Sequence, residues 1–337
     1  MKELGKMTTQ KVVAKKANVS VATVSRYINS VGYISPEVKG RIKKAIKELN
    51  YKPNLVARSL KLRNSKTIGL VFPDIKNPFF IELVRRAEEV AYNNGYNIIL
   101  CITENKLDRE KLYLEVLKGK LIDGYIVIPS SSEDSRLYEV LEGENVVFVD
   151  RSTGLDDEIL IKLDNIQGVR LAIEHLLDLN HRRIGVINVP LNITTGSERF
   201  EGYKAVLAEN GIELQAEYIK YADYSIESSY EKTREILSLK NRPTAIITMS
   251  GLTTLGALKA IKDSGLSIPS DLSIVSFDDF ESSELLNPPI TTVAQPAAEF
   301  GIRAAEILVN LINGKKPRPK RLILEPKLVI RGSCGKL

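Results

Sequence analysis

The chain has 337 residues, of which 43% are hydrophobic and 27% charged, a balance typical of folded globular proteins. This length predicts two or three compact units. No apolar run approaches the ~20 residues that span a bilayer, and the N-terminus lacks an apolar signal core, so we expect the protein in the cytoplasm. Two cysteines far apart, Cys101 and Cys334, indicate reduced thiols and argue against a disulfide framework or zinc site.

Positive charge is concentrated at the start of the chain. Residues 1–66 hold 16 Lys and Arg against 3 Asp and Glu, whereas the remaining residues hold 32 against 39. A basic head on a mildly acidic body is typical of a protein that binds a polyanion. The alternative is a solvated basic surface without a partner.

Short helices are predicted in the basic head. The first ends at Asn18, and Ser20 can cap the second because its hydroxyl can accept from a free backbone N–H of the next turn. The apolar positions of the first helix and its end are Val12, Val13, Ala17 and Val19. The period of the second helix predicts Val21, Val24 and Ile28 on its buried face and Ala22, Thr23, Arg26 and Asn29 facing outward.

A third helix is predicted to begin at Ser35-Pro36-Glu37, which supplies an N-cap, a proline at the first position and an acid in the first turn. Its apolar positions fit a 3.6-residue period and are Val38, Ile42, Ala45, Ile46 and Leu49. Three short helices that share a small core, with a tight link between the first two, are typical of a helix-turn-helix unit.

The second helix suits the major groove of DNA because its outward side chains are short and Arg26 can pair bidentately with guanine. Ser25, Tyr27 and Asn29 are better placed for phosphate contacts or for packing. An amphipathic three-helix unit could instead bind another protein, but the charge imbalance favours DNA. Residues 55–61, after Pro53-Asn54, could form two helical turns, too few to be stable alone. We therefore predict a linker whose order depends on its contacts.

From Thr67 the sequence alternates between apolar strands and amphipathic helices. The strand-like runs are TIGLVF, YNIILCI, GYIVIP, VVFVD, ILIKL, RIGVIN, TAIITM and LSIVSFD. Helical patterns such as ELVRRAEEVAYNNG and GVRLAIEHLLDLN separate most of them. Such alternation predicts parallel sheets covered on both faces. More than 250 residues of it predict two sheets, with a ligand in the crevice at the carboxyl ends of the strands.

Catalytic motifs are missing from the sequence. It contains no GxGxxG, GxxxxGK[ST], GxSxG or HExxH pattern and only two histidines, His175 and His181. Adjacent carboxylates such as Asp278-Asp279 could suggest a glycosidase, but neighbours at a strand end point in different directions. Binding a sugar requires the same carboxylate. We therefore expect a protein that is not an enzyme and that needs no cofactor or metal.

Polar and aromatic side chains follow the predicted strands, where a small polar molecule would bind. Carboxylates and amides suit hydroxyls, arginine forks give bidentate bonds, and aromatic faces cover apolar patches. The candidate effector contacts are Asp74, Asn77, Phe79, Phe80, Arg151, Thr195, Arg199, Tyr224, Ser250 and Asp278. Two alternatives stay open, since Phe79 or Phe80 could be a hydrophobic staple at a helix start and Asp150-Arg151 a surface pair.

The head resembles the DNA-binding head of the LacI/GalR (lactose-repressor) family of bacterial regulators. The segments that carry the resemblance are KVVAKKANVSVATVSRYIN and ISPEVKGRIKKAIKELNYKPNLVARSL. It implies a homodimer on a near-palindromic operator, bases facing Val21, Ala22 and Arg26, and a hinge helix that inserts Leu60 into a minor-groove step. The full set of DNA contacts it implies is Thr9, Ser20, Val21, Ala22, Thr23, Ser25, Arg26, Asn29, Asn54, Ala57, Leu60 and Lys61.

The body resembles the effector domain of the same family, which is similar to periplasmic sugar-binding proteins. The resemblance rests on PDIKNPFF, VDR, LDNIQG, HRRIGVI, RFEGY, LSIVSFDDF and PPITTVAQP. It implies two α/β lobes of parallel sheets, with three chain crossovers near Asp164, Thr292 and Leu322. The expected domains are an all-α head at 1–52, a hinge helix and linker at 53–66 and an effector domain at 67–337. Lobe 1 should comprise about 67–164 and 293–322, and lobe 2 about 165–292 and 323–331.

The resemblance also implies a function, a repressor of carbohydrate metabolism genes controlled by a sugar-like effector. Ser250-Gly251 stand where the family usually has Asn-Asp, which predicts a larger, phosphorylated or acidic sugar. Ile193 stands where purine-binding members carry arginine, which disfavours a purine. No leucine heptads follow Leu328, so we expect a dimer. The alternative is a solute-binding module with an accessory head, and whether the effector releases or tightens DNA binding stays open.

Overall fold

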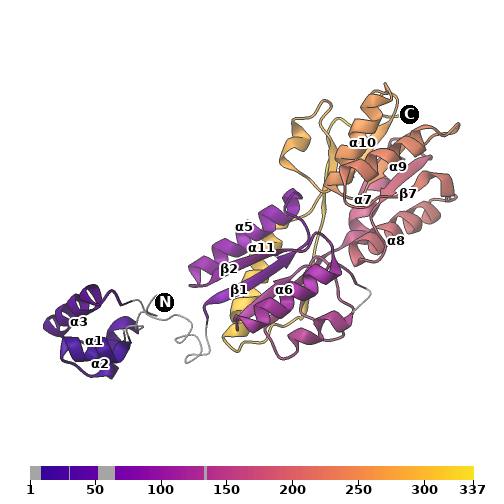
Figure 1. Cartoon of the computed structure of the whole chain (residues 1–337). Helices are drawn as coiled ribbons and strands as arrows, with labels where there is room; N and C mark the ends of the chain where they lie inside the picture. The colour runs from indigo at the N-terminus through magenta and orange to yellow at the C-terminus, as the bar shows by residue number, and fades with distance from the viewer. Residues whose placement is uncertain (1–8, 30, 52–64, 133–134) are drawn as a thin grey trace, which may run out of the picture. The chain divides into compact units, whose positions relative to one another are not determined.

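The computed structural model describes residues 9–29, 31–51, 65–132 and 135–337 (Figure 1). Its internal contacts divide the chain into two compact units, Met1–Ser65 and Lys66–Leu337. The predicted hinge contacts Asn54, Ala57, Leu60 and Lys61 lie outside the described residues.

The head contains the three predicted helices, α1 (Gln10–Ala17), α2 (Val21–Asn29) and α3 (Pro36–Glu48). Asn18 ends α1 in the left-handed region at φ 52°, and Ser35 caps α3, its hydroxyl accepting from the Val38 N–H (3.4 Å). The buried core of the head consists of Val13, Ala14, Ala17, Val24, Ile42, Ala45 and Tyr51. The predicted helical head is confirmed.

Two valines that the helical period placed among the buried positions are exposed. Val12 on α1 is 45% exposed and Val21 on α2 is 40% exposed. The core-facing stripe of α2 runs instead through fully buried Val24 and the partly buried Tyr27 and Ile28. Val21 lies in the first turn of α2, at the edge of that stripe, because a core this small covers only a narrow face of each helix.

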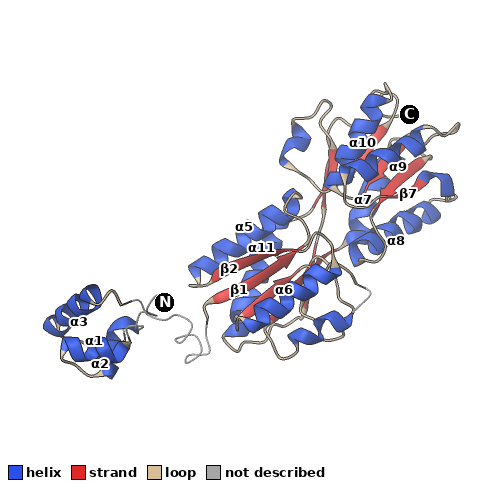
Figure 2. Ribbon diagram, viewed as in Figure 1, coloured by secondary structure: helices blue, strands red, loops and turns tan. Residues whose placement is uncertain are grey.

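The body is built on two six-stranded sheets, each flanked by helices on both faces (Figures 1 and 2). The first sheet has the order β11-β5-β4-β3-β1-β2 and is parallel throughout. Its strands are β1 (Thr67–Phe72), β2 (Asn97–Ile102), β3 (Gly124–Val127), β4 (Val146–Val149), β5 (Leu160–Leu163) and β11 (Arg321–Leu324). Its helices are α5 (Pro78–Asn93), α6 (Leu107–Gly119), the 3-10 helix η1 (Ser135–Leu141) and α11 (Ala297–Ile312). These elements form lobe 1.

The second sheet, with its helices, forms lobe 2. Its order is β12-β10-β9-β8-β6-β7, and only the β12–β10 pair is antiparallel. The strands are β6 (Ile184–Asn188), β7 (Ile219–Tyr221), β8 (Ala245–Thr248), β9 (Ser273–Phe277), β10 (Thr291–Ala294) and β12 (Lys327–Val329). The helices are α7 (Asn165–Asp178), α8 (Thr194–Glu209), η2 (Ala216–Tyr218), α9 (Ile226–Leu237), α10 (Gly251–Asp263) and η3 (Glu281–Glu284). The predicted fold class, two α/β lobes behind a helical head, is confirmed.

The chain crosses between the two sheets three times. It leaves lobe 1 after β5, directly at Asp164, as the sequence predicts. The other crossings come slightly later than predicted, because Thr292 lies inside β10 and Leu322 inside β11. These strands run to Ala294 and Leu324, and the connections at 295–296 and 325–326 each end in a proline, which lacks the N–H that would continue a ladder.

The apolar runs of the sequence did not predict four of the observed strands, β7, β10, β11 and β12. Each has only three or four residues, and β7, β11 and β12 are partly or wholly exposed along most of their length. Of the strands that appear as apolar runs, all except the edge strand β2 are mostly buried, as in β8 and β9, where every residue is buried. Because most strands of both sheets are parallel, their carboxyl ends gather polar loops at one edge of each lobe.

Candidate functional site

The recognition helix predicted from the sequence is α2, and two of its predicted outward residues are exposed. The Thr23 N–H donates to Ser20 Oγ (3.1 Å) and the two hydroxyls lie 2.8 Å apart, so Ser20 caps the helix as predicted. Ala22 and Arg26 are exposed, whereas Thr23 and Ser25 are half-buried. Thr9 is exposed and precedes α1 without a side-chain capping bond. Asn29 is the last residue of α2.

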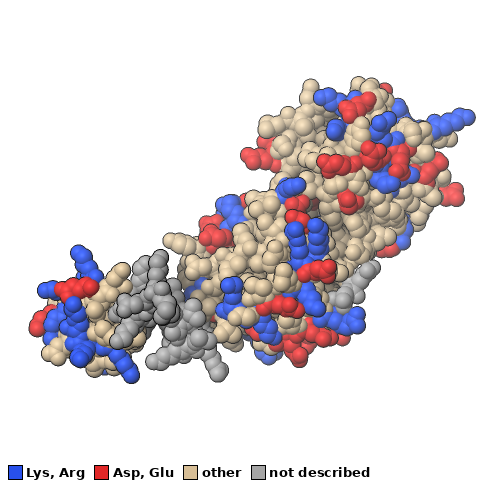
Figure 3. Space-filling model, viewed as in Figure 1, with Lys and Arg blue, Asp and Glu red and all other residues tan. Residues whose placement is uncertain are grey.

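Exposed basic side chains are also frequent on the third helix of the head. Figure 3 shows Lys and Arg gathered on the head, whereas the body displays both signs. The exposed cations of α3 are Lys39, Arg41, Lys43, Lys44 and Lys47. The ion pair between Lys16 and Glu48 (2.7 Å) joins α1 to α3. Short outward side chains beside exposed cations form a surface that can enter a DNA groove and contact phosphates.

In the body, Arg151 lies at the carboxyl end of β4 and contacts residues of both lobes. It is 1% exposed and donates through Nη1 to Asn105 Oδ1 (2.9 Å) and to the Pro129 carbonyl (2.8 Å). Its guanidinium carbon lies 5.3 Å from the ring centre of Tyr224 in lobe 2 and 6.0 Å from that of Phe80 in lobe 1. Cation–π contacts of this kind hold a guanidinium flat between aromatic faces.

Arg199, in the second turn of α8, is the corresponding arginine of lobe 2. It is 4% exposed and lies 3.8 Å above the ring centre of Phe277. Nε donates to Asn165 Oδ1 (2.8 Å) and Nη1 to the Met249 carbonyl (2.6 Å). These partners fix the plane of the guanidinium, and Nη2 has no hydrogen-bond partner among the described residues.

Two buried carboxylates accompany the two arginines. Asp150 and Asp278 directly follow β4 and β9 and both have left-handed backbones, at φ 66° and 81°, a conformation that costs energy for a residue with a Cβ. Asp278 Oδ2 accepts from the Gly251 N–H (3.1 Å), and its Oδ1 accepts from Gln295 Nε2. Burial raises the pKa of Asp150 to about 6, although Arg151 and Arg199 act in the opposite direction.

Unpaired polar atoms gather at these strand ends. Among the described residues, buried side-chain atoms without a hydrogen-bond partner are Asp150 Oδ1, Arg151 Nε, Asn188 Oδ1, Gln295 Oε1 and His175 Nε2. Except for His175, all belong to residues at or next to the carboxyl end of a strand. Because buried polar atoms are normally paired with protein or water, this cluster indicates a place where a polar molecule or ordered water supplies the missing partners.

Other predicted site residues already have structural roles. Asn77 caps α5, its Oδ1 accepting from the Phe79 N–H (3.0 Å), and Ser250 caps α10 in a reciprocal pair with Thr253. The Asp74 carboxylate accepts from the Lys76 N–H (2.7 Å). Buried Thr195 hydrogen-bonds Tyr224, whose pKa is raised by burial.

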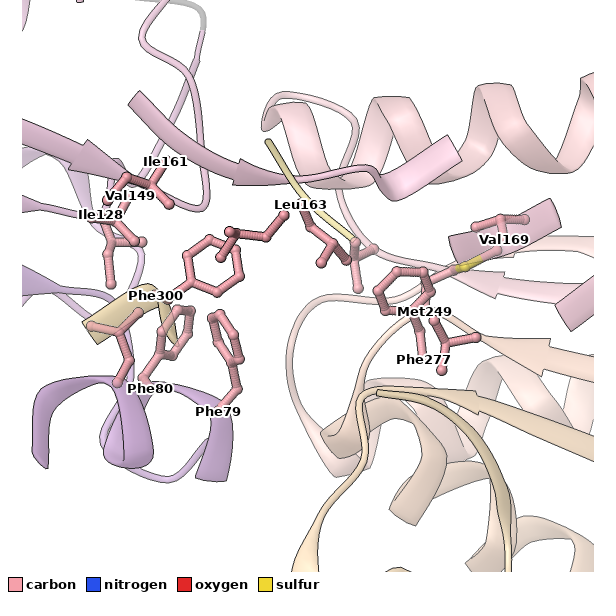
Figure 4. Packing of buried hydrophobic residues seen from close by; sticks show 14 of the residues in the cluster. Phe79, Phe80, Ile128, Val149, Ile161, Leu163, Val169, Met249, Phe277 and Phe300 are labelled. Atoms are coloured by element: carbon pink, nitrogen blue, oxygen red, sulfur yellow. The ribbon is translucent and has the colours of Figure 1, made fainter. Parts of the chain in front are cut away.

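Phe79 and Phe80 lie in the core of lobe 1. Figure 4 shows both rings pointing toward Phe300, while Phe277 lies beside Met249 in lobe 2. The ring centres of Phe79 and Phe300 are 5.4 Å apart. A groove of about 680 Å³ opens between the first turns of α5 and α11 and residues 278–281, and it meets the predicted site at Phe79 and Asp278.

Three polar residues of this region escaped the sequence prediction: the buried Asn165 and Asn188 and the partly buried Gln295. Asn188 ends β6 and Gln295 directly follows β10, so each carries the signal that identifies Asp278, a polar residue at the carboxyl end of a strand. Asn165 begins α7 directly after the first crossover, where a polar residue is also expected as a simple helix start.

Comparison with known proteins shows which family this chain belongs to. Residues 9–54 match the lacI family of bacterial regulatory proteins, and residues 173–334 match a periplasmic binding protein-like domain. The transcriptional repressor PurR of Mannheimia succiniciproducens is 36% identical, over 98% of this chain and 100% of that protein. The ribose operon repressor of Halalkalibacterium halodurans is 39% identical, over 96% of both. The chain belongs to the lacI family of bacterial regulatory proteins.

Two solved structures are similar to nearly the whole chain. The lac repressor dimer bound to operator and an anti-inducer has a TM-score of 0.86 at 27% identity, covering 97% of this chain and 99% of that one. A complex of the transcriptional regulator CelR with cellobiose has a TM-score of 0.73 at 31% identity and the same coverage.

This lacI-family chain is therefore a DNA-binding transcriptional regulator with an effector-binding domain and is not an enzyme, as the sequence predicts. Its partners are operator DNA, a small-molecule effector and a second copy of the chain. The alternative of a solute-binding module with an accessory head is not favoured. No helix within the described ranges has the length and apolar character needed to cross a membrane.

Proposed function

We propose that this regulator acts in the cytoplasm as a repressor of genes for carbohydrate uptake or catabolism, and that a neutral sugar bound between its lobes sets its affinity for the operator. The observation that carries the proposal is the group of two buried guanidiniums and two buried carboxylates at the strand ends, with unpaired polar atoms among them. Carboxylates accept from sugar hydroxyls, and the rings of Phe80 and Tyr224 suit the apolar face of a pyranose or furanose.

A neutral ligand fits the charges better than a phosphorylated or acidic one. Asp150 and Asp278 balance Arg151 and Arg199, and both arginines already donate to carbonyl or amide oxygens of the protein. Arg199 therefore lacks a free fork, since its Nε and Nη1 are both bonded. Arg151 bonds only through Nη1, but its Nε lies 3.6 Å from the Asp150 carboxylate, so an anion of the protein already faces that side of the guanidinium. We therefore propose a neutral sugar, in contrast to the phosphorylated or acidic sugar that Ser250-Gly251 suggests in the sequence.

The predicted effector contacts come from both lobes. A ligand must contact both lobes if its binding is to change the DNA affinity of the head. A ligand shifts an equilibrium only through its different affinity for two arrangements. Arg151 and Phe80 belong to lobe 1, whereas Arg199, Tyr224 and Asp278 belong to lobe 2. A sugar that touches both sets favours one relation of the lobes over another.

The edge of the first sheet supports the homodimer. Strand β2 ends the sheet and exposes two consecutive apolar side chains, Ile99 at 36% and Leu100 at 48%. An uncovered apolar edge strand is a ready pairing surface. We place the second copy at this edge, and Ile99→Lys should convert the dimer to a monomer in light scattering, whereas an unchanged mass would remove β2 from the interface.

A sugar screen on the full chain tests the proposal. The panel contains D-ribose, because one relative is named a ribose operon repressor, together with neutral hexoses, their phosphates, sugar acids and purine bases. We expect a neutral sugar to raise the melting temperature of the body and to change operator affinity in fluorescence anisotropy. A response only to phosphates, sugar acids or purines would contradict the neutral-sugar assignment.

A further inference from the structure

A chain of four polar side chains runs from the sheet of lobe 1 to the arginine of lobe 2. Lys162 on β5 donates through Nζ to Glu198 Oε1 on α8, and Glu198 Oε2 accepts from Asn165 Nδ2 (2.9 Å). Asn165 Oδ1 in turn accepts from Arg199 Nε (2.8 Å). Because a lysine ammonium and a guanidinium only donate and a carboxylate only accepts, the orientation of the Asn165 amide is determined from both ends.

The two halves of this series of side chains differ in burial. Asn165 and Arg199 are 1% and 4% exposed, whereas the Lys162 and Glu198 side chains are 22% and 24% exposed. A partly exposed ion pair contributes little to folding stability by itself. It can still orient a buried amide, because both carboxylate oxygens of Glu198 are occupied, one by Lys162 of lobe 1 and the other by Asn165 of lobe 2.

Other hydrogen bonds join the lobes at the same segment. The Ser132 N–H donates to the Asn192 carbonyl (2.9 Å), and the Thr194 N–H donates to Ser132 Oγ (3.1 Å). The Ser152 N–H donates to Thr194 Oγ1 (3.0 Å). Loops that follow β3 and β4 of lobe 1 therefore hold the segment that leads into α8, two turns from Arg199 at most.

We propose that Lys162 and Glu198 are positioning residues that hold Arg199, through Asn165, in its effector-binding orientation only when the lobes are in this arrangement. The inference rests on the proposed function in one respect, that Arg199 faces the effector. A rotation of the lobes that separates Lys162 from Glu198 removes the cation that holds the Glu198 carboxylate in place, so Asn165 and with it Arg199 are oriented less strictly. Effector affinity then depends on the lobe arrangement, the condition for coupling a binding site to a distant head.

Hydrogen exchange of the full-length protein without sugar tests the bridge directly. Lys162→Met removes the ammonium, and Glu198→Gln leaves one acceptor oxygen for two donors. Each should raise amide exchange of residues 192–199 about tenfold, and the double variant should exceed neither single one, since both break the same chain. Lys162→Arg, which keeps the cation, should exchange like the wild type.

A matched control comes from another ion pair on the same helix. Glu209 on α8 accepts from Arg170 on α7 within lobe 2 (2.6 and 2.8 Å), so Glu209→Gln removes a pair that does not span the lobes. It should leave exchange at 192–199 unchanged. Equal exchange in wild type and Lys162→Met, or additive effects in the double variant, would overturn the proposed bridge.

A titration with D-ribose separates this inference from the proposed function. If D-ribose changes operator affinity, Lys162→Met should raise the sugar midpoint about tenfold at an unchanged melting temperature. An unchanged midpoint in Lys162→Met, together with a shifted one in Asp278→Ala, would overturn the positioning role. If wild type ignores D-ribose, or Asp278→Ala responds like wild type, the proposed function fails in its choice of sugar or site, and the exchange experiment still decides the bridge.

Discussion

The head and the interlobe site present their functional side chains in opposite ways. On α2 the candidate base reader Arg26 is exposed, and its neighbours Ala22 and Val21 are exposed as well. Between the lobes, Arg151 and Arg199 are buried and already bonded to protein oxygens. The described helices of the head therefore offer exposed side chains to DNA, whereas the body must exchange internal contacts for contacts with a small molecule. A ligand that touches groups of both lobes can favour one relation of the lobes over another and so convert binding into a change of shape.

The largest expected effect is the loss of one unit, the head, while the body stays folded. Ile42 is fully buried in the small core of the head, so Ile42→Ala should cost about 2–5 kcal/mol and unfold a unit with little stability to lose. Operator binding in anisotropy should disappear, while the thermal transition of the body in calorimetry stays in place. A lowered transition of the body would show that the units are not independent.

The buried carboxylate of the body should make its stability depend on pH. The folded pKa of Asp150 is about 6, above the ordinary value near 4 for an unfolded Asp, so the native state holds the proton more tightly. Stability should therefore fall by up to about 3 kcal/mol as pH rises from 4 to 7. Asp150→Asn should remove this part of the slope. Parallel melting-temperature profiles of wild type and variant would contradict the assignment.

Replacing the candidate base reader tests the exposed surface of the head. Arg26→Ala should cost about 1–3 kcal/mol on the cognate operator and relax the preference at one position of each half-site. Binding competition against operators altered base by base measures this. Equal losses on cognate and random DNA would remove Arg26 as the base reader.

The smallest effect is expected for a single phosphate contact. Lys15 is exposed on α1, so Lys15→Ala should weaken binding to every DNA sequence alike and reduce the salt slope by about one. Anisotropy titrations over a range of salt concentrations give this slope. A loss confined to the cognate operator would make Lys15 a specificity residue instead.

The head and the body also differ in how much of their structure the sequence could predict. The head was predictable because its information is local: Ser20 and Ser35 cap helices, and a 3.6-residue period selects Val24 and Ile42. That period failed for Val12 and Val21, since it does not show how narrow a face a small core covers. Short strands such as β11 were missed because pairing, rather than their own composition, makes them strands.

In the body, the sequence predicted which residues stand at the strand ends but not what they bind. Arg199 and Asp278 were predictable as polar groups at the mouth of a parallel sheet. The bridge from Lys162 to Asn165 through Glu198 depends on contacts between segments far apart in the chain. No periodicity encodes such contacts, so they required the folded structure.

We propose above all that a small molecule bound at Asp278 controls the affinity of the head for operator DNA. The most direct measurement is operator affinity of Asp278→Ala by fluorescence anisotropy, titrated with the sugar that stabilises the wild type. The variant should bind sugar-free operator like the wild type if the sugar is an inducer, and its affinity should not respond to sugar. A response with the wild-type midpoint would show that Asp278 does not contact the effector and that the site lies elsewhere.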